Sequence, residues 1–193
     1  MDYVYKLLKT CFAHEKLEKE ESDTNSDTES RYKSAGCFFT DGRYVLAGYQ
    51  QNKTVPRISG IGGAKHDGES PVETALRETI EELFNIDYIP QIVITDIKIN
   101  IPPKNVFKNH SYRLVTYTFS DLDYLLKILN KHGMKSPLYN TFPTNFQDLL
   151  FNRKIDKRSE ISHLALLPFV DHAKQSSFVC PLLLSDMSLL INK

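Results

Sequence analysis

The 193-residue sequence carries no net charge, few cysteines and no long apolar run. Its 24 acidic and 24 basic side chains cancel, so no overall field draws the chain to DNA, RNA or an anionic membrane, and a polyanion would need a local patch. Cys11, Cys37 and Cys180 lie far apart and form no C-x-x-C pair, which argues against a disulfide framework or a structural zinc site. These absences predict a cytoplasmic or nuclear protein with no DNA partner.

The sequence also lacks membrane signals. No segment approaches the roughly 18 consecutive apolar residues of a spanning helix, and no apolar run precedes a small-residue cleavage site near the N-terminus. We therefore expect no membrane partner, and nothing in the sequence indicates the oligomeric state. What the chain does have is ordinary globular composition, 41% hydrophobic and 25% charged, which suffices for the core of one domain.

The N-terminal residues differ from the rest in composition. Residues 1–12 have the spacing of a short amphipathic helix, with a frayed end as the alternative. Residues 14–33 are dense in Glu, Asp, Ser and Thr and have almost no large apolar side chains, which predicts a disordered linker. We therefore divide the chain into an N-terminal segment, residues 1–33, and a folded domain, residues 34–193.

Local patterns predict both strands and helices in the folded domain. Asp41-Gly42 is a favoured hairpin turn, and it separates two apolar runs. Strands are predicted over residues 34–40, 44–50, 88–100, 110–119 and 160–169. Helices are predicted over residues 71–84, 121–133 and 181–192, the second opening at Ser120, with a loop over residues 134–147. Strands before and after a central helix predict a mixed, layered α/β domain.

The strongest helix signal begins at Ser70. Ser70 can cap the helix, Pro71 suits its first position, and Glu73 can reach back to complete a capping box. One stripe of the helix is apolar and should pack on the sheet. It comprises Val72, Ala75, Leu76, Thr79 and Leu83.

A neighbouring face of the same helix gathers carboxylates. Glu78, Glu81 and Glu82 fall within about 100° of one another, with Arg77 as the nearby cation. Three carboxylates on one rigid face suit a hard divalent cation such as Mg²⁺ or Mn²⁺, and the glycines that precede the helix let backbone approach closely. The alternative interpretation is a solvated acidic face.

The spacing of these residues resembles the signature of the Nudix hydrolases, G-x5-E-x7-R-E-U-x-E-E-x-G-U. Six of its seven fixed positions are matched, by Gly63, Glu69, Arg77, Glu78, Glu81 and Glu82. The sequence departs from the signature at Phe84, where glycine is usual, at Asn85 and at Thr79. Asn85 tolerates the left-handed conformation that ends helices, so we expect the helix to stop one residue late with every metal ligand kept.

The resemblance implies a fold, an activity and a set of site residues. The fold would be a mixed-sheet α/β/α sandwich, and the activity would be hydrolysis of a pyrophosphate linkage in a nucleoside diphosphate derivative, with Mg²⁺ or Mn²⁺ as cofactor. Glu78, Glu81, Glu82 and the Gly63 carbonyl would hold the metal. Arg77 would orient the glutamates, and Glu69 would hold Arg77.

Two further site residues are left open. The general base would be a glutamate of the helix, such as Glu78, or Glu160 from a later loop; the alternative for Glu160 is a surface position beside Lys157 and Arg158. His66 lies in the loop before the helix, where it would touch substrate or be solvated. His110 and His163 are expected to be structural. Candidates for stacking on a substrate base, each with core packing as the alternative, are Tyr49, Phe107 and Tyr112.

Three functions remain open at this point. The first is an enzyme acting on small nucleotides, and the second is an RNA decapping enzyme, because cap removal is also pyrophosphate hydrolysis. The third is a catalytically silent nucleotide-binding module, against which the intact glutamates argue. Nucleotide or capped RNA is thus the expected partner. A basic set would contact RNA in the second case: Lys104, Lys108, Lys154, Lys157 and Arg158.

Overall fold

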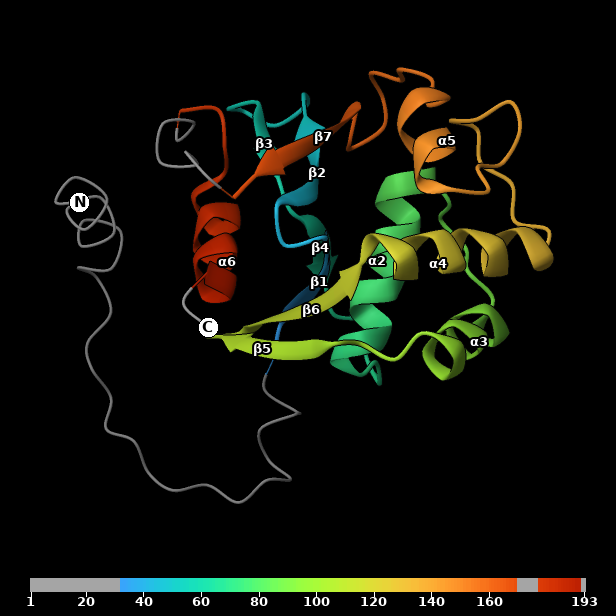
Figure 1. Cartoon of the computed structure of the whole chain (residues 1–193), viewed down its shortest axis with the longest axis horizontal. Helices are drawn as coiled ribbons and strands as arrows, with labels where there is room; N and C mark the ends of the chain where they lie inside the picture. Colours follow the sequence, from blue (N-terminus) through green and yellow to red (C-terminus); the bar gives the residue numbers. More distant parts are fainter. Residues whose placement is uncertain (1–31, 170–176, 192–193) are drawn as a thin grey trace, which may run out of the picture. The chain divides into compact units, whose positions relative to one another are not determined.

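The structure is a computed structural model that describes residues 32–169 and 177–191 (Figure 1). Within these residues, seven strands form one sheet and five helices pack around it. The strands are β1 (Ser34–Thr40), β2 (Tyr44–Gln50), β3 (Arg57–Ser59), β4 (Ile61–Ala64), β5 (Asn105–Asn109), β6 (Tyr112–Thr118) and β7 (His163–Pro168). The helices are α2 (Pro71–Phe84), α3 (Gln91–Asn100), α4 (Phe119–Lys131), α5 (Phe146–Phe151) and α6 (Pro181–Ile191).

The sheet is mixed. β1 runs parallel to β6, while the other strand pairings are antiparallel: β1 with β2 and β4, β2 with β3 and β7, and β5 with β6. β1 therefore lies between β4 and β6, and the pairing of Gly36 with Gly62 and of Ala35 with Gly63 sets β4 beside the centre of the sheet. This register matters for the site, because the chain passes from β4 directly into the loop before α2.

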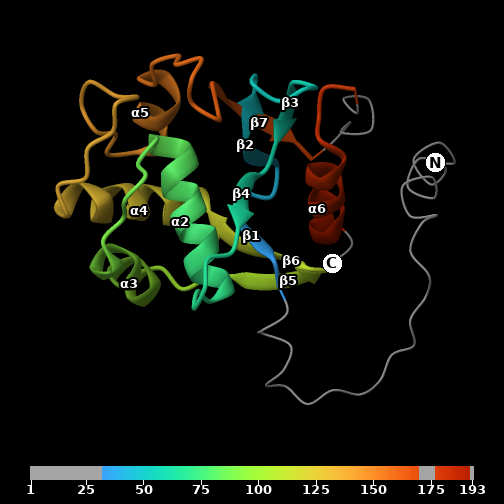
Figure 2. The same cartoon turned by 180° about the vertical axis from the view of Figure 1, so that it is seen from behind.

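Two apolar cores separate the sheet from its helices. The larger core joins one face of the sheet to α2, α3, α4 and α5, and the second joins the other face to α6. Figure 2 shows α2 lying alongside β4 and β1, with α6 on the other side of the strands. Helices on both faces of a mixed sheet make an α/β/α sandwich, and the predicted fold class is confirmed.

Most predicted elements are present. The strands over residues 34–40 and 44–50 have the predicted bounds, and Gly42 adopts a φ of 84° in the turn between them. The predicted strands over 110–119 and 160–169 correspond to β6 and β7, and the helices over 71–84 and 181–192 correspond to α2 and α6. These segments carry local signals, namely apolar runs, a favoured turn between β1 and β2, and the cap of α2.

The prediction of a strand over residues 88–100 is wrong, because this segment contains helix α3. Val93, Ile94 and Ile97 are buried, whereas Ile92 and Ile99 are 63% and 73% exposed. Burial thus follows helical spacing and not alternation. The β-branched residues favour a strand in isolation, but packing against α2 and α4 decides the outcome.

The structure differs from the predictions in other places. The strands β3, β4 and β5 and the helix α5 were not predicted, because segments of three to six residues are too short for a periodic pattern to stand out. Helix α4 begins at Phe119, since Thr118 and not Ser120 provides the cap and forms a capping box with Asp121.

The predicted linker, residues 14–33, is too long at its C-terminal end. Tyr32 is 3% exposed, and its hydroxyl donates to the Glu69 carbonyl at 2.7 Å. The folded part of the chain therefore includes residues 32 and 33. The rest of the predicted linker and the predicted helix over residues 1–12 lie outside the described residues.

Candidate active site

Helix α2 forms as its terminal residues predict. The Ser70 side chain accepts from the Glu73 backbone at 3.4 Å, and the Glu73 carboxylate accepts from the Ser70 backbone at 2.9 Å, which completes the capping box. At the other end Asn85 has a φ of 53° and donates its N–H to the Glu81 carbonyl at 2.7 Å. The helix thus runs through Phe84, and Asn85 ends it in the left-handed conformation.

The apolar stripe of α2 packs on the sheet and sets the rotation of the helix. Ala75, Leu76, Thr79 and Leu83 are buried, and Val72 is partly buried. The Thr79 hydroxyl donates to the Ala75 carbonyl at 2.7 Å, so this polar group is satisfied inside the core. With this face fixed, the glutamate face can only point toward β4 and the loop that follows it.

Arg77 lies at the centre of the carboxylates. Its Nε donates to Glu69 at 2.7 Å, and its Nη1 donates to both Glu78 and Glu81 at 2.8 Å. Its Nη2 donates to the Ala64 carbonyl at 2.6 Å at the end of β4. Burial opposes the charge, but the hydrogen bonds with Glu69 and Glu78 outweigh burial and raise the pKa of Arg77. This guanidinium therefore joins the helix, the loop and the sheet.

Glu69 binds Arg77 and also stabilises the loop before α2. Its carboxylate accepts from the His66 backbone at 2.9 Å and from the Thr74 hydroxyl at 2.7 Å. Burial would raise the pKa of Glu69, but the hydrogen bond from Arg77 and those from His66 and Thr74 lower it overall. Glu69 remains an anion whose oxygens are occupied by protein donors, which suits a supporting position.

Glu82 and Glu78 lie against the glycine backbone of β4. Glu82 is 6% exposed and accepts the Gly62 N–H at 2.9 Å. A methyl group at Gly63 would stand 2.3 Å from a carboxylate oxygen of Glu78, so a side chain there would displace this carboxylate. Burial raises the pKa of Glu81, and burial followed by the charge of Glu160 raises the pKa of Glu82 well above its usual value.

These carboxylates suit a hard divalent cation in their chemistry, although the described residues contain no group of three or more His, Cys, Asp or Glu side chains arranged around one ion. Arg77 draws Glu78 and Glu81 together, whereas Glu82 turns to Gly62. Glu82 is a nearly buried carboxylate with one backbone donor. A bound cation would offset the cost of burying its charge, and oxygen donors of this kind are what Mg²⁺ and Mn²⁺ prefer. The donor set therefore fits the ion.

Glu160 reaches the site from a different part of the chain. It accepts from Gln50 at 3.3 Å and pairs with Lys53 at 2.7 Å, both near the end of β2. Its charge acts on Glu82 across the space between them. Arg158, by contrast, pairs with Asp156. Glu160 thus contacts residues beside the site and does not pair with its neighbours along the sequence.

His66 and the stacking candidates have different surroundings. His66 is exposed, and with Arg77 and Glu81 it lines a cavity of about 450 Å³ beside α2. Phe107 and Tyr112 pack against the core on the α6 side, which favours the packing role for both. Tyr49 meets His163 edge-on with the ring centroids 6.2 Å apart.

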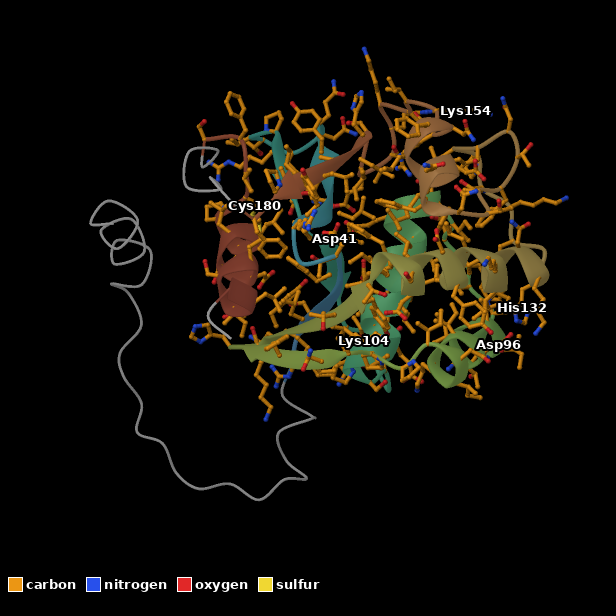
Figure 3. The ribbon with its side chains drawn as sticks, viewed as in Figure 1. Asp41, Asp96, Lys104, His132, Lys154 and Cys180 are labelled. Atoms are coloured by element: carbon orange, nitrogen blue, oxygen red, sulfur yellow. The ribbon has the colours of Figure 1, made fainter. Side chains whose placement is uncertain are left out.

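Two members of the basic set that would contact RNA lie in different parts of the fold. Lys104, just before β5, pairs with Asp121 at 3.2 Å, whereas Lys154 lies beside α5 near the top of the view in Figure 3. These two lysines therefore do not share one basic patch.

Arg153 is a positioning residue that the sequence did not reveal. It donates to the Leu83 carbonyl, to the Glu82 carbonyl at 3.3 Å and to the Ile161 carbonyl at 2.8 Å. The guanidinium thus joins the C-terminal end of α2 to the segment that follows Glu160. Nothing in the local sequence distinguishes Arg153 from its basic neighbour Lys154, because its partners are distant backbone carbonyls.

Comparisons with known proteins bear on the fold only weakly. No model of a known protein family matches the sequence, and no curated protein matches it. None of the helices formed by residues 32–169 and 177–191 is long and apolar enough to cross a membrane.

Solved structures that resemble the chain include a bifunctional NMN adenylyltransferase/ADP ribose pyrophosphatase from Francisella tularensis, at 10% identity and a TM-score of 0.47 over 99% of this chain. The match spans 46% of that protein, a little under half of its length. A NUDIX hydrolase from Nitrosomonas europaea resembles the chain at 14% identity and a TM-score of 0.41, covering 83% of this chain and 88% of the other. A C. elegans Ap4A hydrolase does so at 14% identity and 0.40, covering 82% and 92%.

Proposed function

We propose that the protein is a Nudix-type hydrolase that cleaves a pyrophosphate linkage in a nucleoside diphosphate derivative with the help of a divalent metal ion. The arrangement around Arg77 carries the proposal. Residues that match the signature in sequence also meet in space: Arg77 contacts Glu69, Glu78 and Glu81, and Glu82 contacts the Gly62 backbone beside Gly63. A solvated acidic face, the alternative, would not bury Glu82 to 6% exposure.

Each residue then has a role that follows from its contacts. Glu78, Glu81, Glu82 and the Gly63 carbonyl would hold Mg²⁺ or Mn²⁺, which when bound offsets phosphate charge and makes a bound water more acidic. Arg77 keeps the carboxylates spaced, and Glu69 keeps Arg77 in place.

The general base is assigned to Glu160, with Glu78 as the competing candidate. Gln50 and Lys53 hold the Glu160 carboxylate on the side of the site that faces Glu82. Glu78, in contrast, already shares Arg77 with Glu81. A half-exposed carboxylate on this side of the site can take a proton from an attacking water.

A small nucleotide is favoured over capped RNA as the substrate. Lys104 pairs with Asp121 and lies far from Lys154, so the electrostatic support for a long polyanion is weak. A silent binding module is disfavoured, because burying Glu82 costs stability and serves no purpose in a module without chemistry.

The test is a product assay on the full chain. The protein is incubated with Mg²⁺ or Mn²⁺ and a panel of dinucleoside polyphosphates, nucleotide sugars, nucleoside triphosphates and capped RNA, and the products are separated by chromatography. We expect metal-dependent cleavage of a small nucleotide at a pyrophosphate bond, abolished by a chelator and by Glu82→Gln. Cleavage of capped RNA alone, with a steep fall in affinity as salt rises, would replace the substrate assignment by decapping. No cleavage anywhere in the panel would refute the enzyme assignment.

A further inference from the structure

Arg57 lies on the same face of the sheet as the carboxylates of α2. In the β2–β3 ladder Arg57 is directly opposite Gln50, and Ser59 is opposite Gly48. Opposite residues in such a ladder project to the same face. A methyl group at Gly48 would stand 2.3 Å from Ile161, a residue of the larger core, so this is the face on which α2 packs.

The Arg57 side chain is half-buried and lacks a counter-charge. Its Nε is fully buried and has no hydrogen-bond partner. Within the described part of the chain, none of the carboxylates pairs with this guanidinium, whereas eight other Lys, Arg or His side chains lie within ion-pair distance of a carboxylate. A partly desolvated cation without a partner is costly, and such a group in a native protein calls for a ligand.

The surroundings of Arg57 indicate the chemistry of that ligand. Gln50, its ladder partner, contacts Glu160, and Glu160 pairs with Lys53. Lys53 and Glu160 both act electrostatically on Glu82. Arg57 and Lys53 thus place two positive charges next to the acidic site. The glutamates repel a phosphate chain, and these two cations would attract it.

The spacing along the backbone fits a phosphate chain that spans both features. Arg57 and Gly62 are five positions apart, and β-strand geometry gives a distance of at most roughly 16 Å between them, which the long arginine side chain can shorten. Guanidinium groups bind phosphate oxygens in a bidentate fork, which a lysine cannot reproduce.

We propose that Arg57, assisted by Lys53, binds the phosphate chain of the substrate. The two side chains would contact the phosphate oxygens that face away from the α2 glutamates. The inference rests on the proposed function, since it assigns the substrate-binding residue of that same site. Arg57 selects ligands that carry at least two linked phosphates over nucleosides.

Binding can be measured without hydrolysis. Isothermal titration calorimetry with inorganic pyrophosphate, ADP and adenosine compares the full-length wild type with Arg57→Ala, Arg57→Lys and the control Arg43→Ala. Arg43 is an exposed arginine at the other end of β2, so its loss changes the net charge equally. Thermal melts establish that each variant is folded.

We expect Arg57→Ala to weaken pyrophosphate and ADP binding at least tenfold, Arg57→Lys to restore part of the loss, and Arg43→Ala to bind as wild type does. Equal affinity of Arg57→Ala and wild type for pyrophosphate overturns the inference, as does an equal loss in Arg43→Ala. If the chain hydrolyses no member of the substrate panel but pyrophosphate binding still depends on Arg57, the anion site stands and the proposed function fails. If hydrolysis proceeds with an unchanged KM in Arg57→Ala, the inference fails and the proposed function stands.

Discussion

Replacing Glu73 or Glu82 by Gln should have opposite effects, although both residues lie on helix α2. Glu73 receives hydrogen bonds from Ser70 and from Lys98, the latter at 2.7 Å. Burial alone would raise the pKa of Glu73, but the hydrogen bond from Lys98 outweighs burial and lowers the pKa from 4.5 to about 2. Glu82 instead has one backbone donor, and burial raises its pKa.

The magnitude for Glu73 follows from linkage between protonation and folding. Because the folded-state pKa lies below the unfolded value, the stabilisation is present above about pH 4.5 and is lost as the pH falls toward 2. The difference between the folded-state and unfolded-state pKa values of Glu73 corresponds to at most roughly 3 kcal/mol of unfolding free energy. The Lys98 side chain is 37% exposed, so solvent screening reduces this to roughly 1–2 kcal/mol.

Glu73→Gln should therefore lower the melting temperature by roughly 2–8 °C at pH 7 for a chain of this size, and leave turnover nearly unchanged. Glu82→Gln should keep or raise the melting temperature in a chelator, because it removes a buried charge, and should lower turnover by orders of magnitude.

The assay combines calorimetric melting with turnover, each with and without Mn²⁺. Metal at 100 times its Kd should stabilise the wild type by about 2.7 kcal/mol and Glu82→Gln much less. Wild-type turnover in Glu82→Gln, or a chelator-state melting temperature that falls as far as in Glu73→Gln, would refute the assignment of the glutamate face.

Three further outcomes are expected. A chain that begins at residue 34 should lose roughly 3 kcal/mol of unfolding free energy relative to one that begins at residue 31, because Tyr32 and its hydrogen bond to Glu69 leave the core; urea titration of both would show it. Arg153→Ala should lower kcat about tenfold or more, roughly 1.4 kcal/mol, while Arg158→Ala, whose side chain is 92% exposed, should not; equal rates would show that Arg153 does not position the site. Asp186→Asn should raise the free energy of unfolding by roughly 2–3 kcal/mol at pH 7.5 and have little effect at pH 4. Burial raises the pKa of Asp186 from 3.8 to about 6, so its ionisation above that pH destabilises the fold. A variant that denatures like the wild type in urea at both pH values would contradict this.

Short-range patterns determined helix α2 and the set of residues it presents. The capping box at Ser70, the left-handed end at Asn85 and the apolar stripe each involve residues within a few positions of one another, so the sequence alone specifies them. The spacing of Glu69 and Arg77 across the loop and the first turns of the helix belongs to the same class. Hairpin turn chemistry at Asp41 and Gly42 likewise predicted β1 and β2 with their observed bounds.

Long-range packing decided the remainder. Residues 91–100 have β-branched side chains that favour a strand, yet contact with α2 and α4 makes them helical. The placement of Glu160 beside Lys53 depends on the docking of segments far apart in the chain, and the position of Arg57 opposite Gln50 depends on the register between β2 and β3. Arg153 binds carbonyls about 70 residues earlier in the chain. A side chain's local sequence carries no information about which distant backbone groups lack a partner, so only the tertiary structure could identify these residues.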